Sequence, residues 1–277
     1  MTEDGPYIMA APNGARRGKA DHPNLPIAPE ELAAEAIRCR EAGAAAFHLH
    51  VRDGDGAHSL DPGLYEAALR AVRGAIGDDL VLQITTEAVG RFSAETQMET
   101  VRAVRPEAVS VALREILPDD DHEPAARDFF AWMKGEGIWP QIILYDQNDV
   151  VRFVALHMLG AFAVAVPSVL LVLGRYAEGQ RSEPADLDPF LDALEPIRDR
   201  VDWSICAFGP QENACVARAI SEGGNARVGF ENNLYLPDGD LADYPADLVR
   251  LAADSAQAAG RPPVDAATLR GRIAGWL

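Results

Sequence analysis

Short apolar runs alternate with amphipathic segments along nearly the whole chain. The strand-like runs cover residues 7–13, 45–52, 80–88, 107–115, 140–146, 166–174, 202–209 and 226–232. Segments with helical periodicity follow them, at residues 28–43, 61–77, 93–106, 123–137, 148–162, 186–200, 211–224 and 241–260. Apolar strands that alternate with helices are the pattern of a parallel sheet covered on its faces.

The ends of the predicted helices carry matching signals. Pro29 suits the first turn of the helix at 28–43, and Gly43 suits its end. Eight strand–helix units with no break in composition predict an α/β fold, a closed (β/α)8 TIM barrel that forms a single domain over residues 1–277. An open doubly wound sheet is the alternative, but the loop "AAPNGARRGKAD" after the first strand lacks the GxGxxG fingerprint expected there.

Composition narrows the classes of function. The chain has 277 residues, is 48% hydrophobic and carries a net charge of -18, which argues against a broad surface for nucleic acid but allows a local basic pocket. Its three cysteines are far apart, so a disulfide framework is not expected. No apolar run approaches the roughly 20 residues of a membrane helix, and the first residues do not resemble a signal peptide. We therefore expect a soluble cytoplasmic protein without a nucleic-acid or membrane partner.

The strongest chemical signal is the pair His48 and His50 at the end of the second predicted strand. Their spacing places both imidazoles, and Arg52, on one face of a strand. Active sites of these barrels lie at the C-terminal ends of the strands, and neutral histidine is the commonest metal ligand. A catalytic zinc site needs a third ligand, and Glu231 ends the eighth strand, which closes against the first. Two hydrogen-bonded histidines and a helix-capping glutamate are the structural alternatives.

Three motifs in order resemble one family. They are "PNLPIAPEELAAEA" before the first helix, "HLHVRDGDG" on the second strand and "RVGFENNLYL" on the eighth. Together they resemble the beta-keto acid cleavage enzymes, the family of the 3-keto-5-aminohexanoate cleavage enzyme, and the resemblance covers essentially the whole chain. It implies a zinc-dependent barrel that condenses a beta-keto acid with acetyl-CoA as co-substrate and yields acetoacetate and a new acyl-CoA.

The resemblance also implies roles for single residues. The zinc ligands of the family fall on His48, His50 and Glu231. Its catalytic arginine and hydroxyl groups fall on Arg227, Thr85 with Thr86 beside it, and Ser110. Ordinary packing inside the barrel is the alternative interpretation for the hydroxyl groups. The resemblance further implies a homo-oligomer, a tetramer or a dimer.

One departure from the family pattern affects the expected proton transfer. The family commonly has Glu-Asp-Asn on the eighth strand, where this chain has Glu231, Asn232 and a second asparagine. An amide cannot act as a general base at neutral pH, so Asn232 is expected to orient Arg227 or the substrate instead. Glu87, Asp53 and Glu115 are candidates for a replacement base, and the sequence does not choose between them.

The loop after the first strand is unusually basic for so acidic a chain. It carries Arg16, Arg17 and Lys19, and arginine side chains suit carboxylates and phosphates. We expect Arg16 and Arg17 to bind an anionic substrate tail or the phosphates of CoA, and we expect Asn13 to contribute to substrate binding. Arg52 and Asp53, beyond the two histidines, are expected to orient the metal ligands.

Three other functions are compatible with the same residues. A zinc-dependent lyase or hydrolase would share the metal site but need no acetyl-CoA. A catalytically silent metabolite-binding barrel would bind zinc and ligand without turnover, and a purely structural barrel would bind no metal. Products formed from beta-keto acids and acetyl-CoA distinguish these functions.

Overall fold

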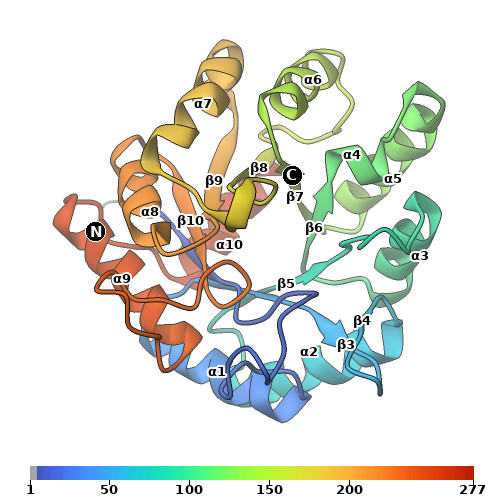
Figure 1. The fold of residues 1–277 in the computed structure, drawn as a ribbon. Helices are drawn as coiled ribbons and strands as arrows, with labels where there is room; N and C mark the ends of the chain where they lie inside the picture. The colour runs from blue at the N-terminus through green and yellow to red at the C-terminus, as the bar shows by residue number, and fades with distance from the viewer. Residues whose placement is uncertain (1–4) are drawn as a thin grey trace.

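The computed structural model of this protein is a closed barrel of parallel strands surrounded by helices (Figure 1). It describes residues 5–277, so the first four residues of the predicted domain lie outside the described part. In order around the barrel, the strands are β1 (Ile8–Ala10), β2 (Ala46–Leu49), β5 (Val81–Thr85), β6 (Ala108–Ala112), β7 (Trp139–Leu144), β8 (Ser168–Leu173), β9 (Asp202–Ala207) and β10 (Asn225–Val228). Strand β10 pairs with β1 and closes the barrel, which confirms the predicted (β/α)8 fold.

Helices connect successive strands on the outside of the barrel. They are α1 (Pro29–Glu41), α2 (Pro62–Ile76), α3 (Ala94–Val104), α4 (Leu113–Ile116), α5 (Glu123–Gly135), α6 (Gln147–Met158), α7 (Asp188–Leu194), α8 (Glu212–Ser221) and α9 (Pro245–Ala258). The ends of two helices are fixed locally. The Ser93 side chain accepts a hydrogen bond from the Thr96 amide at the start of α3, and Gly43, the predicted end of the first helix, follows α1 with a positive φ. Among residues 5–277, no helix is long and apolar enough to cross a membrane.

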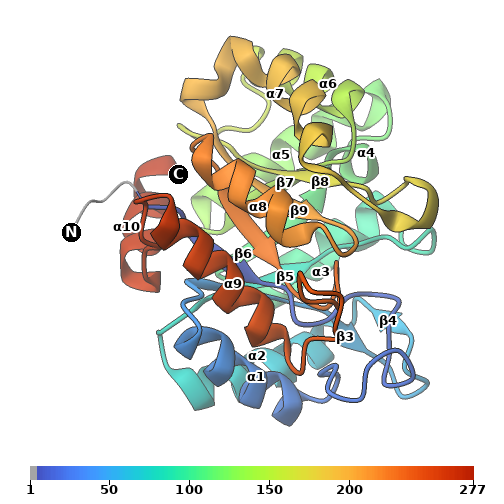
Figure 2. The same ribbon diagram turned by 60° about the vertical axis from the view of Figure 1, so that its left-hand side comes forward.

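A final helix, α10 (Ala266–Trp276), covers one end of the barrel, and the hairpin of β3 (Val51–Arg52) and β4 (His58–Ser59) lies at the other (Figure 2). Leu269 and Ile273 of α10 belong to one apolar cluster with Tyr7, Met9 and Trp139 from the barrel interior. Helix α10 therefore closes the end of the barrel where the strands begin, and ligands must enter where the strands end.

Several predicted strands are longer than the strands observed. Strand β2 ends at Leu49, and Val51–Arg52 pairs antiparallel with His58–Ser59 outside the barrel. The prediction that Arg52 shares the barrel face of the two histidines is therefore wrong. The predicted helix at 186–200 also ends early, since α7 stops at Leu194 and a 3-10 helix follows; Pro196 has no amide hydrogen to continue α7.

Candidate metal centre and active site

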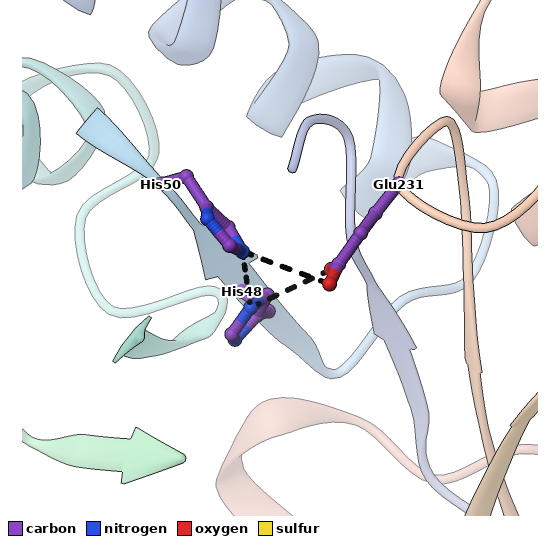
Figure 3. Close-up of side chains that lie close together, drawn as sticks. All are labelled: His48, His50 and Glu231. Carbon is purple, nitrogen blue, oxygen red and sulfur yellow. Dashed lines mark hydrogen bonds and ion pairs between the residues drawn. The ribbon is translucent and has the colours of Figure 1, made fainter. Parts of the chain in front are cut away.

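Barrel closure brings His48, His50 and Glu231 together. His48 lies on β2, His50 follows that strand, and Glu231 lies in the turn after β10 (Figure 3). The two imidazole Nε2 atoms are 3.2 Å apart, and the Glu231 carboxylate oxygens lie 3.6 Å from His48 Nε2 and 3.7 Å from His50 Nε2. One ligand atom from each of the three residues lies within 4.8 Å of the others. The predicted ligand set thus converges on one point.

The chemistry of these three side chains fits a divalent ion. Burial lowers the pKa of both imidazoles well below the usual value, so each presents a neutral nitrogen lone pair. His48 Nδ1 lies 2.7 Å from the Gln83 amide oxygen, which only accepts, so Nδ1 carries the proton and Nε2 is free to bind. Glu231 Oε2 is buried without a hydrogen-bond partner. Two neutral imidazoles and a carboxylate form a donor set that zinc prefers.

Asn13 holds the backbone of His50. Its amide nitrogen donates to the carbonyls of Pro26 and His50, and its amide oxygen accepts from the His50 amide, each at 3.0 Å. These bonds use the polar atoms of a fully buried side chain. Asn13 therefore positions His50, a predicted metal ligand, and its hydrogen-bonded amide is not placed as the predicted substrate contact.

Two glycines allow the Glu231 turn to pack against the loop after β1. Gly229 has a φ of +141°, and a Cβ atom there would lie 2.3 Å from the Ala11 carbonyl oxygen. A Cβ atom at Gly14 would lie 2.7 Å from Glu231 Cγ. The position of the carboxylate therefore depends on the absence of side chains at both glycines.

Polar side chains from the loop after β1 and from α8 fix the same turn. Arg17 Nη1 donates to the Phe230 carbonyl at 2.7 Å. The buried Glu212 carboxyl on α8 accepts from the Gly229 amide and from Asn233 Nδ2, each at 3.3 Å, and burial raises its pKa to about 8. Arg17 thus supports the turn that carries Glu231.

Arg227 is a buried cation beside the ligand set. Its Nη2 lies 3.1 Å from Glu231 Oε1 and 3.4 Å from Cys206 Sγ. Burial alone would lower the pKa of this guanidinium, but the Glu231 carboxylate together with Cys206 and Tyr145 more than offsets burial and raises the pKa above its usual value. Arg227 therefore stays charged at the floor of the site.

Buried polar atoms without hydrogen-bond partners concentrate around these residues. Within residues 5–277, six of the ten such atoms belong to residues predicted for the site, namely His50, Ser110, Arg227, Glu231 and Asn232. Both amide atoms of Asn232 are among them. Since buried polar groups are normally paired, this concentration indicates a place built to receive a polar ligand.

Two adjoining cavities open at this place. Thr85 and Arg227 line the inner cavity, and Gly14, Arg16 and Arg17 line the outer cavity. Four residues form part of the wall of both cavities, namely Glu87, Arg175, Phe208 and Glu231. Among the predicted site residues, these cavities are lined by Arg16, Arg17, Thr85, Glu87, Arg227 and Glu231, whereas Ser110 and Asn232 line neither cavity.

Glu87 faces both cavities. Its Oε2 lies 3.9 Å from His50 Nδ1, and its Oε1 lies 3.5 Å from Arg175 Nη2. The alternative bases lie elsewhere: the Asp53 carboxylate accepts from backbone amides in its own turn, and Glu115 accepts from the Ala88 amide and lines neither cavity. Glu87 is the one of the three that reaches the site.

The structure separates the remaining predicted residues. Thr85 lines the inner cavity, and its Oγ1 accepts from the Glu87 amide, whereas Thr86 Oγ1 donates to the Ser110 carbonyl and lines neither cavity. Arg52 donates to the carbonyls of Gly14 and Arg17. The expectation that Arg52 and Asp53 orient the histidines is wrong, because both fix loop backbone instead.

Three residues of the site escaped the sequence analysis. Gln83 orients His48, Glu212 supports the Glu231 turn, and Arg175 lines both cavities. Gln83 carries a readable signal, because the two-residue period of a strand places it on the same face as Thr85. Glu212 lies on an outer helix, where no pattern distinguishes it from a surface glutamate.

Fold and site together define a class: a TIM barrel in which two buried histidines and one carboxylate lie close together at the mouth. A family model described as "beta-keto acid cleavage enzyme" matches residues 6–274. The chain belongs to this family, whose members cleave beta-keto acids and transfer acyl groups.

Curated relatives span most of the chain. It is 28% identical over 260 residues to the 3-keto-5-aminohexanoate cleavage enzyme of Acetoanaerobium sticklandii, with 92% of this chain and 93% of that protein covered. It is 27% identical over 270 residues to the 3-oxoadipate:acetyl-CoA acetyltransferase of Cupriavidus necator, with 95% and 92% covered. The solved structure of ObcA with oxaloacetate has a TM-score of 0.75 at 20% identity, covering 92% of this chain and 68% of that one, and supports the fold.

Proposed function

We propose that this protein is a zinc-dependent enzyme that condenses a beta-keto acid with acetyl-CoA and releases acetoacetate and a new acyl-CoA. The observation that carries the proposal is the convergence of His48, His50 and Glu231 in a buried, cavity-lined site. Family membership supports the reaction, and the printed name of the Cupriavidus necator relative includes acetyl-CoA as a substrate.

His48, His50 and Glu231 would hold the metal. When bound there, a divalent ion supplies Lewis-acid charge that favours loss of a proton from the carbon between the ketone and the carboxylate. Arg227 supplies a second positive charge at the floor of the cavity, where negative charge develops on the substrate oxygens. The Thr85 hydroxyl, which lines the inner cavity, provides a hydrogen bond that orients the substrate. The Ser110 hydroxyl and the Asn232 amide are proposed to support this role, because both are buried without hydrogen-bond partners.

Glu87 is the base in this proposal. It accepts the proton from the substrate carbon, a role that the amide of Asn232 cannot fill. The resulting carbon nucleophile attacks the thioester carbonyl of acetyl-CoA, and the acetyl C–S bond breaks with release of the CoA thiolate. The thiolate then attacks the ketone carbon of the original acyl group, and the carbon–carbon bond to that group breaks. The carbanion left on acetoacetate takes back the proton from Glu87, so one C–C and one C–S bond form, one of each breaks, and the products are acetoacetate and the new thioester.

Arg16 is proposed to bind an anionic group at the barrel mouth. It is exposed, lines the outer cavity and has no hydrogen bond or ion pair within the described residues. Its position suits the phosphates of CoA or the tail of an anionic substrate. Arg17, which we also expected to bind anions, has one guanidinium nitrogen committed to the Phe230 carbonyl.

A panel of beta-keto acids incubated with the zinc-loaded protein and acetyl-CoA tests the proposal. We expect acetoacetate to accumulate with at least one acid, and we expect Glu231→Gln to abolish its formation. Absence of acetoacetate across neutral, acidic and amino-substituted acids would contradict the proposal. Equal turnover without acetyl-CoA would instead favour a lyase or hydrolase.

A further inference from the structure

Arg175 occupies a position that the proposed reaction does not use. It lies just after β8 and lines both the inner and the outer cavity. Its side chain is only 11% exposed, so a nearly buried guanidinium lies where the outer cavity meets the inner cavity. Such a cation needs an anionic partner to offset its loss of hydration.

The described residues satisfy only part of the hydrogen-bonding capacity of the Arg175 guanidinium. Arg175 makes one side-chain hydrogen bond among the described residues, from Nη2 to Glu87 Oε1 at 3.5 Å, the outer limit for such a bond. A guanidinium has five N–H donors. Aromatic rings hold the group in place, with Phe208 and Tyr176 centroids 5.3 Å and 5.8 Å from its central carbon. The guanidinium is thus fixed in position and has donors to spare.

The location of Arg175 selects one part of the substrate. A beta-keto acid held near Arg227 and Glu231 has its carboxylate and ketone at the deep end of the inner cavity. The rest of the molecule can extend only toward the outer cavity, and Arg175 forms part of both walls. The guanidinium therefore lies along the path of the substrate tail, on the wall that Glu87 shares with both cavities.

The charges around the tail favour an anion. The outer cavity contains three arginines, Arg16, Arg17 and Arg175, and two carboxylates, of which Glu231 is already paired with Arg227. A basic wall in a chain of net charge -18 is a local feature and not a general property of the surface. An ammonium tail would meet a guanidinium there, whereas a carboxylate can take two parallel N–H donors from it.

We propose that Arg175 binds a second carboxylate, at the far end of the substrate, so that the preferred substrates are beta-keto dicarboxylic acids. This inference rests on the proposed function, since it assigns the substrate class of the same site. Arg175 is a specificity residue in this account. Arg16, farther out and exposed, remains available for CoA.

The test compares a linear beta-keto dicarboxylate with the beta-keto monocarboxylate in which a methyl group replaces the distal carboxylate. Wild-type protein is expected to favour the dicarboxylate in kcat/KM by about 10- to 100-fold, the range of a hydrogen-bonded charge. Arg175→Met keeps the length of the stem and is expected to remove that preference. The KM for acetyl-CoA is expected to stay unchanged. Arg198→Met is the matched control, because Arg198 is also ion-paired and stacked on an aromatic ring, Trp203, but lines neither cavity.

Other outcomes would overturn the assignment. Equal loss on both substrates would make Arg175 a structural residue, and a rise confined to the KM for acetyl-CoA would assign it to the CoA phosphates. If the protein forms no acetoacetate at all, the proposed function fails, and calorimetric binding of adipate and hexanoate still decides the role of Arg175. Tighter binding of adipate that is lost in Arg175→Met supports the inference, and equal binding of the two acids overturns it.

Discussion

His48 Nδ1 lies 2.7 Å from the amide oxygen of Gln83, and this contact fixes which nitrogen of the imidazole can bind a metal. Gln83 is itself held by Gln141, whose amide nitrogen donates to Tyr7 and Ser204 at 3.2 Å and 3.0 Å. The proton on His48 is thus set by a hydrogen-bonded chain across the barrel interior.

Removing the amide should weaken metal binding. Gln83→Leu keeps the approximate volume but leaves His48 Nδ1 without an acceptor, so the Nε2 lone pair is no longer held toward the ion. We expect a loss of metal affinity of about 10- to 100-fold, the range for such supporting residues, measured by competition with a chelator. Gln97→Leu is the control, because Gln97 is equally buried but lies on α3. Unchanged affinity in Gln83→Leu would show that the contact does not orient the ligand.

A methyl group at Gly14 should displace Glu231. The added Cβ would lie 2.7 Å from Glu231 Cγ, which is too close for both atoms to keep their positions. We expect Gly14→Ala to lower zinc content after dialysis and to lower kcat/KM, while Gly18→Ala in the same loop, where the added atom meets nothing within 4 Å, leaves both near the wild-type values. Identical behaviour of the two variants would argue against this packing constraint.

Glu87→Gln should separate catalysis from metal binding. The substitution removes the proposed base but none of the three ligands, so kcat should fall by about 10²- to 10⁴-fold with full metal content. Glu115→Gln is the matched control, since Glu115 lines neither cavity and is expected to keep activity within about threefold. A larger fall in kcat for Glu115→Gln than for Glu87→Gln would show that Glu115, and not Glu87, is the base.

Glu212 should make stability depend on pH. Burial raises the pKa of its carboxyl from 4.5 to about 8, so between these values the folded state keeps a proton that the unfolded state has lost. The free energy of unfolding then falls as pH rises through this window. Since each pKa unit corresponds to about 1.4 kcal/mol, Glu212→Gln should reduce the fall between pH 5 and pH 8 by roughly 2–4 kcal/mol. Urea unfolding at several pH values checks this, with the exposed Glu178→Gln as control for the loss of one charge. Parallel pH curves for wild type and Glu212→Gln would contradict the prediction.

Most of the fold could be read from the sequence because each strand–helix unit repeats the same hydrophobic pattern. The predicted element boundaries were wrong where pairing between distant residues overrides the local strand preference. The run at 45–52 is uniformly strand-like, yet it leaves the barrel after Leu49 because Val51 and Arg52 pair with His58 and Ser59. No periodicity within the run marks that point.

The ligand set was readable for a different reason. His48 and His50 are close in sequence, and barrel closure dictates that the end of the eighth strand lies near them. The roles of Asn13 and Arg175 were not readable, because they depend on which backbone or cavity each side chain reaches. The sequence shows that an asparagine and an arginine are present, but not which backbone groups or cavity walls their side chains reach.

The fate of the acetyl carbons tests the central claim most directly. The protein is incubated with an unlabelled beta-keto acid and with acetyl-CoA that carries ¹³C at both acetyl positions, and the products are followed by NMR. We predict label in the ketone and methyl carbons of acetoacetate, with the carboxylate and methylene carbons unlabelled, and no such product from Glu231→Gln. Label that remains in acetyl-CoA or appears in free acetate while the keto acid is consumed would contradict the account.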